Sequence, residues 1–185
     1  MRIITTVGTS LITNYLNPDK NTDINKNFKS YFKNKLQDKE FSDSIWKSLQ
    51  NEDYFKKFKK QLLEELKKDN SCAEKSTLDK IKKNNDEIFL LTTYTIDGYF
   101  VGNLLADYYN VKAENLMIIE GLQVHKPDEF KDKGINKLIE KIKEIKNGNE
   151  DVILNISGGY KALIPILTII GQLENIPLKY IYEDS

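Results

Sequence analysis

The sequence predicts an α/β fold: a Rossmann-like parallel sheet with crossover helices and a helical insertion after the first strand. Three observations predict it. The chain opens on a β-rich run, residues 2–7, that stops at Gly8. From residue 86 onward, strand-like runs alternate with helical ones. The run at 87–94 begins with a continuous apolar stretch, which is typical of a strand in a parallel sheet that is covered on both faces.

The predicted elements follow one another in a regular order. After the first strand, "GTSLITN" is expected to be a turn, and a lysine-rich helical region occupies residues 17–85. In that region, residues 53–69 place apolar side chains at helical spacing, and Ser76 or Thr77 is a plausible cap for a helix over 76–84. We expect one domain over residues 1–185, with 17–85 as an elaborated first crossover. The later elements are expected at 87–94 (strand), 97–109 (helix), 115–121 (strand), 132–148 (helix, with Gly148 as its C-cap), 151–157 (strand), 159–174 (helix) and 177–184 (strand).

The last of these helices contains a proline. Pro165 is tolerated in a first helical turn but not deep inside a helix. The helix proper should therefore begin near Ala162 or Leu163, or be kinked there. In either case the preceding Gly-Gly-Tyr-Lys segment forms an irregular entrance.

Composition restricts the classes of function. Lys+Arg and Asp+Glu both number 28, so the formal net charge is +0, which does not favour a protein that binds duplex nucleic acid. A single cysteine, Cys72, excludes an internal disulfide and a cysteine metal cluster. The N-terminus lacks the features of a signal peptide, and no run reaches the roughly 18 apolar residues that span a bilayer. We expect a cytoplasmic protein with no membrane partner, no metal and no cofactor.

Small and polar residues follow the predicted strands. The carboxyl ends of parallel strands meet at one edge of the sheet, where ligands bind. Lys161 brings the one full positive charge in these turns, and the start of the last helix favours an anion. The glycines are equally consistent with plain strand-to-helix turns, and neither the P-loop nor the dinucleotide-binding spacing is present. The candidate ligand-binding residues are Gly8, Thr9, Ser10, Leu11, Thr93, Thr95, Gln123, Asn155, Ser157, Gly158, Gly159, Tyr160 and Lys161.

Two segments resemble a known family. "TVGTSLITN" (6–14) and "ILNISGGYKALIPILTIIGQLENIPLKYIYED" (153–184) resemble the CARF (CRISPR-associated Rossmann fold) domains of type III CRISPR systems, in the branch with Gly-Thr-Ser and Gly-Gly-Tyr-Lys turns. The resemblance covers roughly residues 1–16 and 86–185. It implies a homodimer with one symmetric pocket for a cyclic oligoadenylate, most often cyclic tetra-adenylate. Phosphates would meet backbone N–H groups of both turns and Lys161, and adenines would be read by Thr93, Thr95, Gln123 or Asn155.

The resemblance leaves open whether the ring is cut. In a ring nuclease the ribose 2′-OH attacks the adjacent phosphorus without a metal. The resemblance gives the catalytic roles to Ser10, which would position the ribose or the phosphate, and to Lys161, which would stabilise the negative charge that develops on the phosphate. The alternative is a non-hydrolytic sensor that regulates a partner or a missing effector domain. A HEPN ribonuclease motif, Arg-x(4–6)-His, cannot form from Arg2 and His125. An unrelated nucleotide-binding Rossmann enzyme lacks its glycine fingerprint here. Ring size, and whether the native chain continues past Ser185, stay open.

Overall fold

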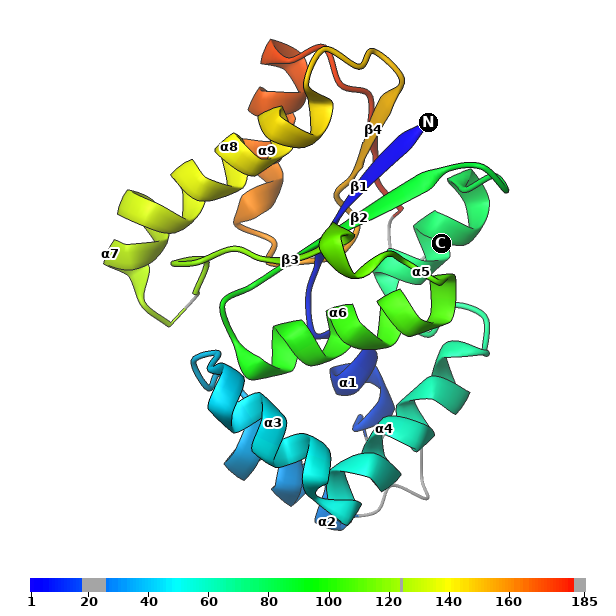
Figure 1. Ribbon diagram of the computed structural model, residues 1–185, viewed down its shortest axis with the longest axis vertical. Coiled ribbons are helices and arrows are strands. Elements are labelled where there is room, and N and C mark those ends of the chain that lie inside the picture. Colours follow the sequence, from blue (N-terminus) through cyan, green and yellow to red (C-terminus); the bar gives the residue numbers. More distant parts are fainter. Residues whose placement is uncertain (18–25, 124, 182–185) are drawn as a thin grey trace.

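The computed structural model describes residues 1–17, 26–123 and 125–181 (Figure 1). In this part of the chain, five strands form one sheet in the order β3-β2-β1-β4-β5, and all neighbours are parallel. The predicted α/β class with a Rossmann-like parallel sheet is confirmed. The strands are β1 (Arg2–Val7), β2 (Glu87–Thr92), β3 (Leu116–Ile118), β4 (Val152–Asn155) and β5 (Leu178–Lys179).

The strand order creates a switch point beside the central strand. The chain moves outward from β1 to β2 and β3, then returns to place β4 on the other side of β1. Ligands of open α/β sheets bind beyond the carboxyl ends of the strands at such a point. In this sheet the switch point lies between β1 and β4, whose carboxyl ends are Val7 and Asn155.

Helices cover both faces of the sheet. Successive side chains of a strand point to opposite faces, so Ile3 and Val7 join one apolar core and Ile4 joins the other. Figure 1 shows α6 and α1 on one side of the strands and α8 with α9 on the other. Crossovers that run in opposite directions along a parallel sheet place their helices on opposite faces, because each crossover is right-handed.

The first face carries the helices that connect β1 to β2 and β2 to β3. In α4, Phe55, Phe58, Leu62 and Leu66 are buried, so the predicted apolar stripe faces the core. The Phe55 ring lies 4.6 Å from that of Phe100 in α6. The elements are α1 (Ser10–Tyr15), α2 (Lys26–Tyr31), a π-helical turn (Phe32–Leu36), α3 (Asp43–Asn51), α4 (Asp53–Leu66), α5 (Ala73–Ile81), α6 (Ile96–Tyr109) and a 3-10 turn (Ala113–Asn115).

The second face carries α8 (Ile135–Lys146) and α9 (Leu163–Leu173), which bury Leu138, Ile142 and Leu167 among others. The short α7 (Pro127–Glu129) and a π-helical turn (Phe130–Gly134) lead into α8. As expected from Pro165, α9 begins at Leu163 and holds the proline in its first turn.

Three local expectations were wrong. The segment expected to be a turn forms α1, because Leu11 and Ile12 are fully buried and their packing outweighs the turn-favouring Thr, Ser and Asn. Helix α5 begins at Ala73, so Ser76 and Thr77 lie inside it rather than at its cap. Helix α8 ends with Asn147 in the left-handed conformation as its C-cap, one residue before Gly148.

The final strand is shorter than expected. β5 covers only Leu178–Lys179 of the expected 177–184, and residues 182–184 lie outside the described part. Residues 18–25 of the predicted insertion also lie outside it. Among the helices described, none has the length and apolar character needed to cross a bilayer.

Candidate functional site

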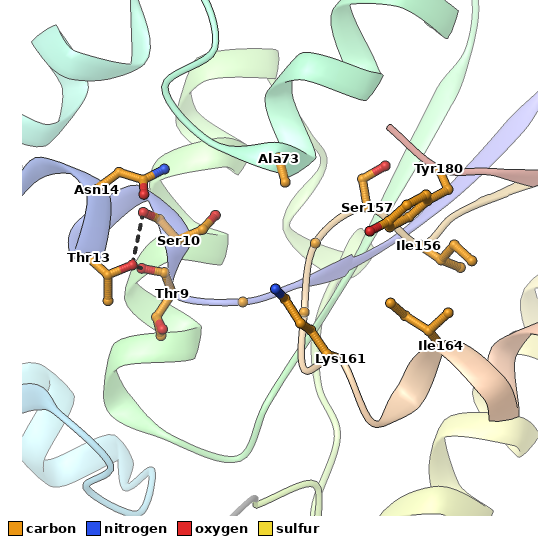
Figure 2. A pocket seen from close by; sticks show the side chains of 13 residues that line it. Thr9, Ser10, Thr13, Asn14, Ala73, Ile156, Ser157, Lys161, Ile164 and Tyr180 are labelled. Carbon is orange, nitrogen blue, oxygen red and sulfur yellow. Dashed lines mark hydrogen bonds between the residues drawn. The ribbon is translucent and has the colours of Figure 1, made fainter. Parts of the chain in front are cut away.

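A pocket of about 350 Å³ lies at the switch point (Figure 2). Both sequence turns contribute to its wall, since Gly8 follows β1 and Ile156 follows β4 directly. A small-molecule site commonly measures about 300–1,000 Å³, so this pocket is at the small end of that range. Its lining consists of Gly8, Thr9, Ser10, Thr13, Asn14, Ala73, Ile156, Ser157, Gly158, Gly159, Lys161, Ile164 and Tyr180.

The two turns are packed directly against each other through their glycines. A Cβ atom on Gly8 would lie 2.9 Å from the backbone nitrogen of Gly159. Gly159 itself has φ +90°, a conformation that side-chain-bearing residues rarely adopt. The Thr6 hydroxyl donates to the carbonyl of Gly158 at 2.9 Å. The glycines thus allow close packing of the two turns, so that the ends of β1 and β4 form one wall of the pocket.

A buried carboxylate joins the turns from beneath. Glu74, in the first turn of α5, is 0% exposed. Its Oε1 accepts from the Gly8 N–H at 2.7 Å, and its Oε2 accepts from the Ser10 hydroxyl at 3.0 Å. A Cβ atom on Gly158 would lie 2.2 Å from the Glu74 side chain, so this glycine makes room for the carboxylate. Among the described residues, no cation pairs with Glu74.

The neighbouring cysteine responds to this carboxylate. Burial, followed by the charge of Glu74, raises the pKa of the Cys72 thiol well above its ordinary value. Cys72 is therefore a neutral, buried thiol in the floor of this region rather than a reactive one.

On its other side, the pocket is lined by hydrogen-bond donors that have no partner among the described residues. Figure 2 shows the Lys161 side chain directed into the space between Thr9, Ser10 and Ser157. Lys161 has no ion-pair partner in the part of the chain that the structure describes. Of the residues that line the pocket, Gly158, Gly159 and Lys161 likewise have backbone N–H groups without an acceptor in the described part of the chain. Successive free N–H groups beside an ammonium form a site suited to an anion.

Side-chain hydrogen bonds fix the second turn. The Asn155 amide donates to the carbonyl of Glu74 at 3.4 Å, while its oxygen accepts from the Ser157 N–H at 3.1 Å. The Thr77 hydroxyl donates to Ser157 Oγ at 2.6 Å, and that oxygen also accepts from the N–H of Ile181. Helix α5 is thus hydrogen-bonded to both turns.

Part of the predicted ligand-binding set lines the pocket. Its members there come from both turns: Gly8, Thr9, Ser10, Ser157, Gly158, Gly159 and Lys161. Leu11 instead packs in the core, and Asn155 lies buried behind the wall. Tyr160 is 40% exposed and packs edge-on against Phe130, with ring centroids 5.9 Å apart.

The remaining predicted residues lie at the ends of β2 and β3, outside this pocket. Thr95 caps α6 by accepting from the Gly98 N–H, and its hydroxyl shares a 2.8 Å hydrogen bond with Thr93. Gln123 donates to the carbonyl of Tyr94 at 3.1 Å, and its Oε1 is buried without a partner among the described residues. A β-bridge between Glu40 and Thr95 brings the helical insertion over this edge.

Sequence reasoning missed Glu74 behind the wall and several residues of the wall itself. Glu74 is the most consequential of them, and it lies in the predicted lysine-rich helical region, to which no site residue was assigned. Its one local signal is the small-residue run 71–73 that interrupts the charged pattern immediately before it. No sequence motif indicates three other residues that line the pocket, which are Ala73, Ile164 and Tyr180. In the described residues, no three His, Cys, Asp or Glu side chains are grouped so as to hold a metal ion.

Comparison with known proteins places the chain in a family. Part of it is similar to a protein named Peptidase T from Clostridium botulinum (strain Okra / Type B1), with 32% identity over 91 residues. That similarity covers 49% of this chain, and the chain spans only 22% of that relative's length. The family model for "CRISPR-associated protein (Cas_APE2256)" matches residues 69–185, which include α5, the Gly-Gly-Tyr-Lys turn and more than half of the chain. The chain therefore belongs to the CRISPR-associated Cas_APE2256 family.

Proposed function

We propose that this CRISPR-associated protein binds a cyclic oligoadenylate, with cyclic tetra-adenylate as the favoured ring, and cleaves it without a metal. Cleavage would end the signal that such rings carry in type III CRISPR systems. One observation carries the proposal: Lys161, Gly158 and Gly159, whose backbone N–H groups have no acceptor among the described residues, share a switch-point pocket with Ser10. Phosphodiester oxygens fit those donors, because each N–H and the ammonium favours negative charge.

The chemistry needs few protein groups. The ribose 2′-OH attacks the adjacent phosphorus, the bond to the 5′-oxygen breaks, and the product carries a 2′,3′-cyclic phosphate. Holding the hydroxyl in line with the leaving oxygen and stabilising charge on the phosphate are the two tasks that remain. In our proposal Ser10 contacts the ribose, while Lys161 stabilises the phosphate charge and assists the departing 5′-oxygen.

Pocket size favours a site made by two copies of the chain. A cavity of about 350 Å³ is at the small end for a small molecule and is insufficient for four nucleotides. A ring of four identical units is compatible with a two-fold axis, so two identical half-sites suit it. In the same helix that follows the Gly-Gly-Tyr-Lys turn, Ile169 and Leu173 are 56% and 75% exposed and lie four residues apart on one face. We assign this face to the contact between copies.

Incubation with labelled cyclic tetra-adenylate in EDTA tests the proposal. Wild-type protein should yield linear di-adenylates ending in a 2′,3′-cyclic phosphate. Lys161→Ala should lose at least about 100-fold in cleavage rate, since it removes a preorganised charge from the transition state. Lys47→Ala, which removes an exposed lysine of α3, serves as the matched control and should cut normally. Normal cutting by both Lys161→Ala and Ser10→Ala would refute the site assignment.

A second candidate is a sensor that binds the ring and leaves it intact. It is favoured by the bonds of Ser10 and Gly8, whose donors are already committed to Glu74 and so are not available to the phosphate of a ring. The same incubation separates the two functions. A bound ring that is recovered unchanged after many hours would support the sensor and contradict cleavage.

A further inference from the structure

We infer that Glu74 is a positioning residue for cleavage: through the Ser10 hydroxyl it accepts the proton that the attacking ribose 2′-OH must lose. This inference rests on the proposed function and adds to it a proton acceptor, which neither motif contains. Glu74 belongs to α5, outside both sequence turns, and reaches the pocket only through the group that it orients.

The hydrogen-bond geometry gives Ser10 a defined direction. Its hydroxyl donates to Glu74 Oε2 at 3.0 Å, and a carboxylate has no proton to return in that bond. The one hydrogen of Ser10 Oγ therefore points into the protein. Neither lone pair of Oγ has a donor among the described residues, and Ser10 lines the pocket. A ribose hydroxyl beside Ser10 would consequently donate its proton toward Oγ, which orients the 2′-oxygen lone pairs toward phosphorus.

The burial of Glu74 supports a task beyond packing. Its side chain is fully buried, and none of the described residues supplies a cation to it, whereas the adjacent buried Lys75 pairs with Asp79. Burying a carboxylate without a cation is costly, so hydrogen bonds alone are a weak structural reason to keep it. Across the pocket, Lys161 is a cation without a carboxylate partner among the described residues. Ser10, which is hydrogen-bonded to Glu74 behind it, and Lys161 thus line one pocket. A route to a proton acceptor and a cation therefore meet there, which is the pair that the reaction requires.

The step balances without a co-reactant. As the 2′-oxygen forms its bond to phosphorus, the 2′-OH proton passes to Ser10 Oγ, and the Ser10 proton passes to Glu74. The bond from phosphorus to the 5′-oxygen breaks, and that oxygen takes a proton from the Lys161 ammonium. The product is an isomer of the ring, opened to a 2′,3′-cyclic phosphate and a 5′-hydroxyl. Solvent then returns the proton from Glu74 to Lys161.

A conservative substitution separates this role from a structural one. In Glu74→Gln the amide oxygen still accepts from Gly8, and the amide nitrogen faces Ser10, so the turn keeps its support but loses its proton acceptor. We expect ring affinity within about threefold of wild type and a cleavage rate lower by about 100-fold or more, the usual size of a general-base contribution. Glu64→Gln, an exposed carboxylate of α4, is the matched control and should change neither value.

The decisive readout is a double-mutant cycle with Ser10→Ala. If Glu74 acts through Ser10, adding Glu74→Gln to Ser10→Ala should change the residual rate by less than about twofold. We call this transfer of the proton from the 2′-OH through Ser10 to Glu74 the relay. The relay is wrong if Glu74→Gln protein cuts at the wild-type rate, or if the substitution slows cleavage equally in the wild-type and Ser10→Ala proteins. Should the Gln variant fail to fold, Glu74→Asp replaces it, because it keeps the carboxylate but withdraws it from Ser10. The relay requires that Asp slow the wild type and leave the Ser10→Ala background unchanged; equal slowing contradicts it.

Ring binding and ring cleavage by the wild-type protein distinguish a failure of the relay from a failure of the proposed function. If wild type cuts the ring and only the Glu74 variants behave unexpectedly, the relay alone is wrong. If wild type neither binds nor cuts cyclic tetra-adenylate, the proposed function is wrong and the relay falls with it. A wild type that binds the ring but leaves it intact contradicts cleavage and relay together, while binding stands.

Discussion

Gly158→Ala tests the steric core of the site. An alanine Cβ at this position would lie 2.2 Å from Cγ, Cδ and Oε1 of Glu74, far inside the 3.4–4 Å of ordinary contact. Glu74 is fully buried and bonded to both Gly8 and Ser10, so its carboxylate cannot simply swing into solvent. Either the carboxylate moves and gives up these bonds, or the Gly-Gly turn shifts away from it.

The magnitude follows from overpacking a well-filled interior. Such substitutions typically cost about 1–3 kcal/mol. For a chain of this length each kcal/mol lowers the melting temperature by about 2–4 °C, so Gly158→Ala should melt about 2–12 °C below wild type. Ring cleavage should fall as well, because the displaced carboxylate no longer orients Ser10.

Thermal unfolding of a double-mutant cycle isolates the clash. Glu74→Ala removes the atoms that the new Cβ would meet, so Gly158→Ala should cost much less in that background than in wild type. Gly148→Ala is the matched control: nothing lies within 4 Å of its added Cβ, and its cost, about 1–2 kcal/mol, comes from φ +72° alone. That cost should add to the cost of Glu74→Ala within about 0.5 kcal/mol. A Gly158→Ala protein that melts with wild type, or a substitution that costs as much in the Glu74→Ala background, would refute the reasoning.

Three further predictions concern other parts of the molecule. Hydrogen bonds from Lys133 and Lys137 lower the pKa of Glu120 to about 2, so wild type should melt above Glu120→Gln at neutral pH. That difference should fade as pH falls from 4.5 toward 2; a difference that persists at pH 2 contradicts it. Leu173→Asp should convert a dimer to a monomer in light scattering and lose ring binding, whereas Ile45→Asp, which alters an exposed side chain of α3, should do neither. Leu62→Ala, at a fully buried position of α4, should cost about 2–5 kcal/mol in urea unfolding, and a loss under about 1 kcal/mol would be inconsistent with its packing.

Much of the fold was predictable because the sheet signals are local. Apolar runs such as residues 87–92 have few alternatives to a buried parallel strand, and of the two alternatives that Pro165 left, a start near Leu163 is the one that α9 adopts. The α1 segment was not predictable from its residue types, because Thr, Ser and Asn favour turns unless tertiary packing buries the Leu11-Ile12 pair.

Only those parts of the candidate site that lie close together in the sequence were predictable. The two glycine turns were found because they follow the β1 and β4 segments directly. The approach of Glu74 to Gly158 joins positions 84 residues apart in sequence, so no local pattern reveals it. The resemblance gave Thr95 and Gln123 an adenine-reading role, which stays a prediction. The structure adds that Thr95 caps α6 and that Gln123 donates to the carbonyl of Tyr94, two contacts that residue type alone did not reveal.

Native mass spectrometry with cyclic tetra-adenylate tests the central claim most directly, because it counts chains and rings in one species. Lys161→Ala protein should be used, so that a bound ring persists during the measurement. We predict an assembly of two chains with a single ring, from which Leu173→Asp yields one chain and no ring. A single chain that carries its own ring, or a dimer that carries two or none, would contradict a half-site built from the Gly-Thr-Ser and Gly-Gly-Tyr-Lys turns of each copy.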